Sequence, residues 1–212
     1  MDNISVIIRN RNEERYIGYS IQSVLDFFDK PEIIIVDNGS TDNSMSIINT
    51  FDFEDIKTYS IDSYTPGKSL NHGVTKCSND YILVLSAHSQ ITECNFDKLK
   101  SCLDKYCSVG GIQIPIWNGK KINRRYVWSN FIDKDDVNYF SKNENRYFLH
   151  NAFTFYRKET LIEYPFDETL STKEDRYWIN ERVEDGMKFY YDSDTICHHH
   201  YTENGSTWKG IG

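Results

Sequence analysis

The chain has 212 residues, with 32 acidic and 24 basic side chains and a formal net charge of −8. This length suits one large domain with a substantial core, and the acidic balance argues against a general nucleic-acid-binding protein. Five cysteines without a C-x-x-C pair favour free thiols over a disulfide framework or a zinc knuckle.

No apolar stretch approaches the roughly 20 residues that span a bilayer. The N-terminus, Met-Asp-Asn-Ile, leads directly into a predicted strand and does not have the form of a signal peptide. We therefore expect a soluble, cytoplasmic protein without a transmembrane segment.

The first half of the chain alternates strand and helix patterns. Short apolar runs predict strands at residues 4–8, 32–36, 56–61, 81–85 and 109–115. Apolar residues at helical spacing predict helices over residues 13–28, 43–51, 70–77 and 96–106. Such alternation implies right-handed crossovers and an α/β fold with a mostly parallel sheet.

The second half is less regular. Residues 116–147 are polar, charged and aromatic without a clean period, which predicts a long, partly ordered excursion over the site. Regular structure is expected again at residues 148–156, in a helix over 173–183, and in two short strands over 188–191 and 195–200. We expect a single domain made of two parts, residues 1–115 and residues 116–212.

The most informative stretch is the buried strand pattern at residues 81–85, which stops at Ser86-Ala87-His88. In an open α/β sheet, ligands bind beyond the carboxyl ends of the strands. A functional imidazole at His88 is therefore one reading, and an ordinary polar residue at a strand end is the other.

Five segments in order carry a resemblance to a known family. They are Ile4–Ile17 (ISVIIRNRNEERYI), Ile34–Asp42 (IIVDNGSTD), Gly67–Gly73 (GKSLNHG), Leu85–His88 (LSAH), and a last series of PFDE at 165–168, KED at 173–175, Gly186 and HHH at 198–200. Together they resemble the family 2 inverting glycosyltransferases, most closely the bacterial surface-polysaccharide branch with its rhamnosyltransferase-like sequences. The resemblance covers nearly the whole chain. It implies a GT-A fold, with a Rossmann-like central sheet flanked by helices and a smaller C-terminal portion on the acceptor side.

The resemblance also implies a site for a nucleotide-diphospho-sugar. The positions that would hold the nucleotide are Arg9, Asn10, Arg11, Asp37, Asn38, Lys68, Asn71, Ser86 and Ala87. Asn38 stands where many members of the family have Asp, so the identity of the base is left open. Without the resemblance, Asp37 would be interpreted as a turn residue that binds its own backbone.

The family's metal-binding Asp-x-Asp motif is replaced here by Ser86-Ala87-His88. Imidazole is a competent ligand for manganese, whereas carboxylates suit magnesium better. His198 and His200 lie two apart, so they would share one face of a strand. We expect a divalent metal, Mn or Mg, bound by His88, His198 and His200. The alternative is that His88 contacts the diphosphate directly and that no metal is used.

By the same resemblance, Asp175 would be the catalytic base and Glu174 would orient it or the acceptor. An inverting transfer is one in-line displacement and needs one suitably placed carboxylate. Without the resemblance, both carboxylates would be interpreted as helix-capping residues.

The acceptor side is predicted from an aromatic and basic cluster. Its members are Trp117, Arg124, Arg125, Tyr126 and Trp128. Aromatic faces stack on sugar rings, and Arg pairs with hydroxyls or with a lipid diphosphate. The two Trp side chains would equally serve to pack this segment onto the domain.

The leading hypothesis is an inverting glycosyltransferase that acts on a glycan or a lipid-linked acceptor in surface polysaccharide synthesis. It would work in the cytoplasm or, by peripheral association, at the inner face of the membrane. The missing aspartates at Ser86 and His88 motivate a second hypothesis, a nucleotide-sugar-binding protein that has lost catalysis. A sugar nucleotidyltransferase is a third, but the loop after the first strand, residues 9–14, has no glycine.

Overall fold

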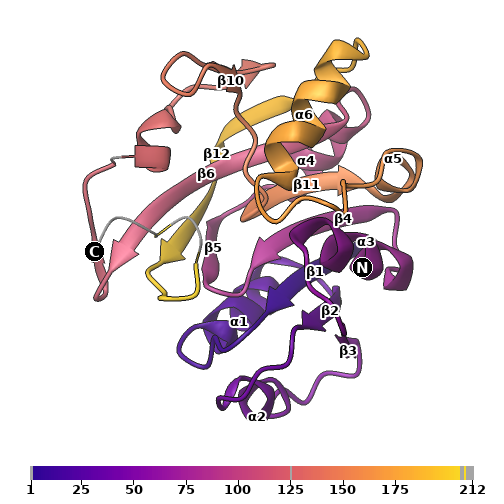
Figure 1. The fold of residues 1–212 in the computed structure, drawn as a ribbon, viewed down its shortest axis with the longest axis vertical. Coiled ribbons are helices and arrows are strands. Elements are labelled where there is room, and N and C mark those ends of the chain that lie inside the picture. Colours follow the sequence, from indigo (N-terminus) through magenta and orange to yellow (C-terminus); the bar gives the residue numbers. More distant parts are fainter. Residues whose placement is uncertain (1, 125, 206–207, 209–212) are drawn as a thin grey trace.

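One large sheet organises the molecule (Figure 1). The computed structural model describes residues 2–124, 126–205 and 208. The long strands are β1 (Ile4–Asn10), β2 (Glu32–Asp37), β3 (Ile56–Ser60), β4 (Tyr81–Ser86), β5 (Ser89–Glu93), β6 (Ser108–Trp117), β11 (Phe153–Arg157) and β12 (Tyr190–His200). Within the described residues they run in the spatial order β3-β2-β1-β4-β11-β6-β12-β5.

Helices cover both faces of this sheet. They are α1 (Ile17–Phe27), α2 (Ser44–Ile48), α3 (Pro66–Lys76), α4 (Phe96–Leu103), α5 (Lys158–Glu163) and α6 (Glu174–Glu184). Apolar residues of α1, α2 and α4 belong to one core cluster, and those of α3, α5 and α6 belong to another. Within the described chain, none of these helices has the length and apolar character needed to cross a membrane.

The first four strands of the spatial order are parallel, because β1 pairs in parallel with β2 and β4, and β2 pairs with β3. Alternate residues of β1 enter opposite clusters: Val6 and Ile8 pack with α1, whereas Ile7 packs with α3. Burial on both faces explains why these strands are continuous apolar runs in the sequence. The predicted α/β class with a mostly parallel sheet flanked by helices is confirmed.

The other half of the sheet is mixed. Strand β11 is antiparallel to β4 and β6, while β12 is parallel to β6 and antiparallel to β5. Residues 1–115 and 116–212 therefore contribute to the same sheet. The two short strands predicted at residues 188–200 are one strand, β12, with an irregular register between Asp192 and Ile196.

Two helix starts differ from the prediction. Helix α1 begins at Ile17 and not at Glu13. Before it the chain forms a turn in which the carbonyl of Glu13 accepts the N–H groups of Tyr16 and Ile17, while the N–H groups of Glu13 and Glu14 donate to Ser44 Oγ and Asp42. Helix α3 begins already at Pro66, where Thr65 caps it by accepting the N–H of Lys68 at 3.2 Å. A Thr N-cap followed by Pro at the first helical position is a favourable helix start.

The described residues of the long excursion after β6 form short elements only. They are β7 (Lys120–Lys121), a 3-10 helix η1 (Tyr126–Asn130), β8 (Asp136–Val137), β9 (Phe140–Ser141) and β10 (Arg146–Tyr147). A third apolar cluster, which includes Trp128, Phe131 and Phe148, packs this segment against Ile112 and Ile114 of β6. The excursion is therefore fixed to the sheet beside the site.

Candidate functional site

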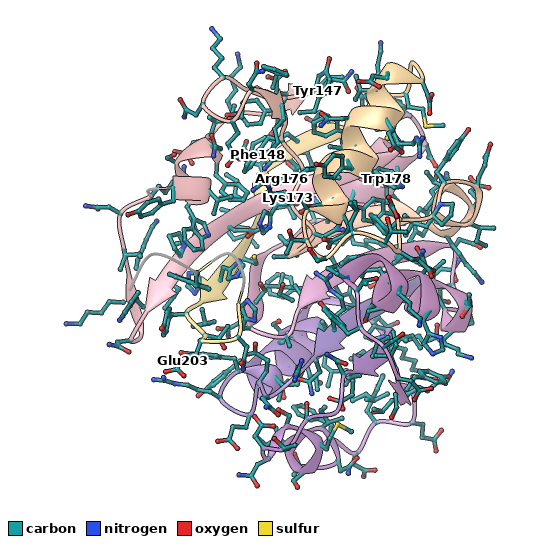
Figure 2. All side chains as sticks on the ribbon, viewed as in Figure 1. Tyr147, Phe148, Lys173, Arg176, Trp178 and Glu203 are labelled. Atoms are coloured by element: carbon teal, nitrogen blue, oxygen red, sulfur yellow. The ribbon has the colours of Figure 1, made fainter. Side chains whose placement is uncertain are left out.

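A cleft of about 840 Å³ lies where β1 and β4 end and α6 begins. Residues from the β1 loop, such as Arg9 and Arg11, form one wall, and Lys173 to Arg176 form another. Figure 2 shows Lys173 and Arg176 at the end of α6 that faces the N-terminal half of the chain. The volume falls within the range of small-molecule sites, and the position matches the rule for open α/β sheets.

Most of the predicted nucleotide-binding residues line this cleft. They are Arg9, Asn10, Arg11, Asn38, Ser86 and Ala87, with His88 beside them. Asp37, Lys68 and Asn71 are not among the residues that line it.

Asp37 instead organises the loop next to the cleft. Its Oδ1 accepts a hydrogen bond from Asn10 Nδ2 at 2.9 Å, and its Oδ2 accepts the N–H of Ser40 at 3.0 Å. These contacts fit the interpretation of Asp37 as a turn residue, because it accepts the N–H of Ser40 in its own loop. It also binds Asn10 at the end of β1. The bond fixes the amide of Asn10, whose buried Oδ1 has no hydrogen-bond partner within the described chain. Asn10 thus offers a free acceptor at the cleft.

Lys68 and Asn71 connect α3 to its neighbours. Lys68 Nζ donates to Ser63 Oγ. The amide of Asn71 makes two bonds with the backbone of Phe166, from Nδ2 to the carbonyl at 2.9 Å and from the N–H to Oδ1 at 3.0 Å. Asn71 therefore ties α3 to the segment after α5, whereas Lys68 binds the loop that precedes its own helix.

The predicted metal position His88 faces another histidine. Its Nε2 lies 3.0 Å from Nε2 of His199, and its Nδ1 lies 3.3 Å from Oε1 of Glu13. Nδ1 of His88 makes no regular hydrogen bond among the residues described. At the end of β4, the two nitrogens of His88 therefore face different partners, His199 at Nε2 and Glu13 at Nδ1.

The other two predicted ligands do not take this place. His198 and His200 share a face of β12, as the alternation of a strand requires, but His199 between them carries the ring that meets His88. The ring of His200 stacks on Tyr16 at a centroid distance of 4.7 Å. Burial lowers the pKa of His200 to about 4 and that of His199 well below the usual value.

The imidazoles of His88 and His199 fit a divalent cation by their chemistry, because imidazole is a ligand for transition-metal ions. Glu13 lies at the other nitrogen of His88, where a carboxylate orients the ring. Among the described residues, one group of three side chains has its ligand atoms within 4.8 Å of one another, namely Asp135, Asp192 and Asp194, away from these histidines. There Lys98 Nζ lies 2.6 Å from Asp192 and 2.9 Å from Asp194. The ammonium group of Lys98 therefore lies among these carboxylates and offsets part of their negative charge.

Asp175 lies in the first turn of α6 and lines the cleft. Its Oδ2 accepts the backbone N–H of Asn151 at 3.0 Å, and its Oδ1 accepts the N–H of Arg176 at 2.8 Å. The residue is 7% exposed. These two bonds fix the carboxylate in one orientation at the wall of the cleft.

Glu174, the predicted partner of Asp175, instead binds across the cleft. Its Oε1 lies 3.0 Å from Arg9 NH1. Burial alone would lower the pKa of Arg9, but the charges of Glu174 and Asp175 outweigh it and raise that pKa. The ion pair joins the end of β1 to the start of α6.

Asn151 is a cleft residue that the sequence did not reveal. Its Oδ1 accepts the hydroxyl of Tyr156 at 2.6 Å, while its buried Nδ2 lacks a hydrogen-bond partner within the described residues. Glu13 and His199 were also missed. Glu13 lies in the same loop as Arg11, which is a weak sequence signal for a residue of the site. His199 could be identified only from the register in which β12 pairs with β5 and β6.

The predicted acceptor residues divide into two groups. Trp128 is fully buried and its ring lies 4.3 Å from that of Trp208, so it packs the excursion onto the domain and has no face left for a sugar. Trp117 stacks on Tyr201 at 4.2 Å. Tyr126 is 61% exposed and lines the cleft. Arg125 lies outside the described residues.

The sequence matches the family model described as Glycosyl transferase family 2 over residues 5–164. The minor teichoic acid biosynthesis protein GgaA of Bacillus subtilis is 28% identical over 196 residues, which are 84% of this chain and 42% of that protein. A dolichyl N-acetyl-alpha-D-glucosaminyl phosphate 3-beta-D-2,3-diacetamido-2,3-dideoxy-beta-D-glucuronosyltransferase of Methanococcus voltae is 24% identical and covers 90% of this chain and 64% of that protein. The chain thus spans less than two thirds of either relative.

Among solved structures, residues 1–349 of S. aureus TarS in complex with UDP-GlcNAc superpose with a TM-score of 0.72. The match covers 98% of this chain and 61% of the TarS chain, at 18% identity. At that identity the comparison establishes a shared fold.

Proposed function

Because the chain belongs to glycosyl transferase family 2, we propose that it is an inverting glycosyltransferase that uses a nucleotide-diphospho-sugar. The acceptor would be a hydroxyl group of a glycan or of a lipid-linked saccharide in surface polysaccharide synthesis. GgaA is named for teichoic acid synthesis, and TarS was solved with UDP-GlcNAc. These relatives make a uridine diphosphate sugar the first donor to test. The reaction belongs to the cytoplasm, and a lipid-linked acceptor would bring the protein to the inner face of the membrane.

The observation that carries this proposal is that Asp175 lines the same cleft as the residues of the β1 loop. In an inverting transfer the acceptor oxygen attacks the anomeric carbon as the bond from that carbon to the diphosphate breaks. Asp175 takes the proton of the acceptor hydroxyl, and the diphosphate leaves on the other side of the sugar ring. The two backbone N–H groups that bind Asp175 hold it in position for this step.

The β1 loop provides the donor side of the proposed site. Arg9 and Arg11 line the cleft, and guanidinium groups bind phosphate oxygens with paired hydrogen bonds. The free Oδ1 of Asn10 can accept from an N–H of the base. Tyr126, which also lines the cleft, is the proposed contact for a sugar ring of the acceptor.

We include a divalent metal in the proposal, with Nε2 of His88 and Nε2 of His199 as the atoms that would hold it and Glu13 as the carboxylate that orients His88 through Nδ1. When bound, such an ion would neutralise part of the charge on the departing diphosphate. His88 and Glu13 line the cleft, while His199 is 1% exposed behind them. This arrangement replaces the set of His88, His198 and His200 expected from the sequence.

The first experiment is a thermal-shift screen of UDP, GDP, dTDP and CDP, each with and without manganese. A ligand that binds only the folded state must raise the melting temperature. A shift for one nucleotide identifies the base, and no shift with any of the four would contradict the donor site.

The second experiment compares Asp175→Asn with Glu184→Gln, an exposed carboxylate at the far end of the same helix. We expect Asp175→Asn to lower turnover by about 10²–10⁴-fold while the nucleotide shift remains, and Glu184→Gln to leave both unchanged. Both oxygens of Asp175 accept N–H groups, so the melting temperature of the Asn variant must be measured alongside. Unchanged turnover in Asp175→Asn would refute its role as the base.

One further function is favoured by the absence of aspartate at Ser86 and His88, namely a nucleotide-sugar-binding protein without catalysis. Hydrolysis of the donor sugar in the absence of acceptor separates the two possibilities. A transferase hydrolyses its donor slowly, whereas a catalytically inactive protein binds the nucleotide and hydrolyses none.

A further inference from the structure

Four side chains form a chain of contacts that joins two residues of the cleft wall, His88 and His150, through two buried residues, His199 and Gln113. His88 follows β4, His199 belongs to β12, Gln113 to β6, and His150 precedes β11. His88 meets His199 at 3.0 Å, His199 Nδ1 lies 2.8 Å from Gln113 Oε1, and Gln113 Nε2 lies 3.0 Å from His150 Nδ1. Gln113 is fully buried and His199 nearly so.

The orientation of the Gln113 amide follows from its second contact with His150. Gln113 Nε2 also lies 3.4 Å from the backbone carbonyl oxygen of His150. A carbonyl oxygen only accepts hydrogen bonds, so the amide nitrogen of Gln113 must face His150. The amide oxygen then faces His199.

This orientation determines where the proton of His199 lies. Because Gln113 Oε1 only accepts, His199 Nδ1 must carry a hydrogen and donate it. His199 is 1% exposed, and a buried imidazole without a carboxylate partner is neutral, so its other nitrogen carries no hydrogen. Nε2 of His199 therefore presents a lone pair toward His88.

The distance between the two imidazoles suits a shared cation. Two nitrogens bound to one ion at about 2.1 Å are separated by about 3.0 Å at a right angle and about 3.4 Å in a tetrahedron. The observed separation between His88 Nε2 and His199 Nε2 is 3.0 Å. A metal-bound histidine usually donates its other N–H to a carbonyl or carboxylate, which fixes its tautomer. Gln113 supplies that carbonyl oxygen to His199.

We propose that Gln113, itself oriented by His150, is a positioning residue that holds His199 in the Nδ1–H tautomer and so presents Nε2 as a metal ligand. This inference rests on the metal site of the proposed function. It also predicts a preference for manganese, cobalt or zinc over magnesium, because two of the ligands are imidazoles.

The tautomer is tested without any metal. In ¹⁵N-labelled protein, long-range ¹H–¹⁵N correlation spectra identify which nitrogen of His199 carries hydrogen. We expect Nδ1–H in the unmodified protein and in Gln113→Glu, which keeps an acceptor oxygen. Gln113→Leu should lose the exclusive Nδ1–H form. An Nε2–H form in the unmodified protein would overturn the proposal.

Cobalt binding provides the second test. CoCl₂ alone is titrated by calorimetry and by the visible absorption of the bound ion. We expect Gln113→Leu to weaken binding by about 10–100-fold and Gln113→Glu to stay within about 3-fold of the unmodified protein, since it retains the oxygen that orients the ligand. His150→Phe should have a smaller effect than Gln113→Leu, because the backbone carbonyl of His150 still accepts from Gln113.

Gln90→Leu is the matched control. Gln90 lies opposite His198 in the register of β5 and β12, outside the chain of contacts, and its substitution should leave cobalt binding unchanged. Equal affinity in Gln113→Leu and the unmodified protein would overturn the positioning role. No cobalt binding in the unmodified protein would overturn the metal site as well. A retained nucleotide shift and Asp175-dependent transfer would still support the proposed transferase.

Discussion

The ion pair between Arg9 and Glu174 predicts a measurable coupling between the two sides of the cleft. Its atoms lie 3.0 Å apart, and the side chains of Arg9 and Glu174 are 19% and 7% exposed. Glu174→Gln keeps the shape of the side chain and removes its charge. Arg9→Met removes the other charge and keeps most of the aliphatic length.

The magnitude follows from this partial burial. Removing one partner of a fully buried pair costs about 3–5 kcal/mol, whereas an exposed pair contributes about 0.2–1 kcal/mol. Arg9 retains some contact with water in the cleft. We therefore expect Glu174→Gln to lower the free energy of unfolding by about 2–3 kcal/mol, between these two limits.

The assay is urea unfolding of the unmodified protein, both single variants and the double variant. The coupling energy from this cycle should be about 1–3 kcal/mol. Glu184→Gln on the same helix serves as the control and should leave stability within about 0.5 kcal/mol. A coupling energy below about 0.5 kcal/mol would refute the reasoning, because the pair would then behave as an exposed one.

Two further predictions concern stability. A Cβ at Gly67 would collide with the backbone carbonyl of Asp167, so Gly67→Ala should destabilise the fold by about 1–3 kcal/mol; urea unfolding measures this, and an unchanged midpoint would contradict it. Burial alone would raise the pKa of Asp135, but hydrogen bonds from Tyr190 and Ser193, with the charge of Lys98, lower it to about 2. Its contribution to stability is therefore present above about pH 4 and lost as the pH falls toward 2. Asp135→Asn should flatten the acid side of the stability profile, and an unaltered profile would contradict this.

Much of the sheet was predictable from the sequence because buried parallel strands are continuous apolar runs. β1, β2 and β4 follow this pattern. β5, Ser-Gln-Ile-Thr-Glu, was missed because it has a single apolar residue. The start of α3 at Pro66 could have been predicted from the N-cap residue Thr65 and the proline after it. The prediction instead used the apolar residues, which begin at Leu70.

The candidate site was predictable only in part, for physical reasons. Alternation along a strand correctly groups His198 with His200, but which face meets His88 depends on pairing with β5 and β6. That pairing joins segments about a hundred residues apart and has no local signal. The role of Trp128 could not be predicted either, because an aromatic residue in a polar segment can contact a sugar or pack in the core, and the sequence is the same in both cases.

The place of β12 in the sheet has a consequence for how the protein is made. Strands β6 and β5 each bind β12 and not one another. Until residues 190–200 leave the ribosome, both strands have an open edge that could pair with another chain. The same late strand brings His199 to His88, so the emerging polypeptide acquires this histidine pair only when the gap in its sheet is closed.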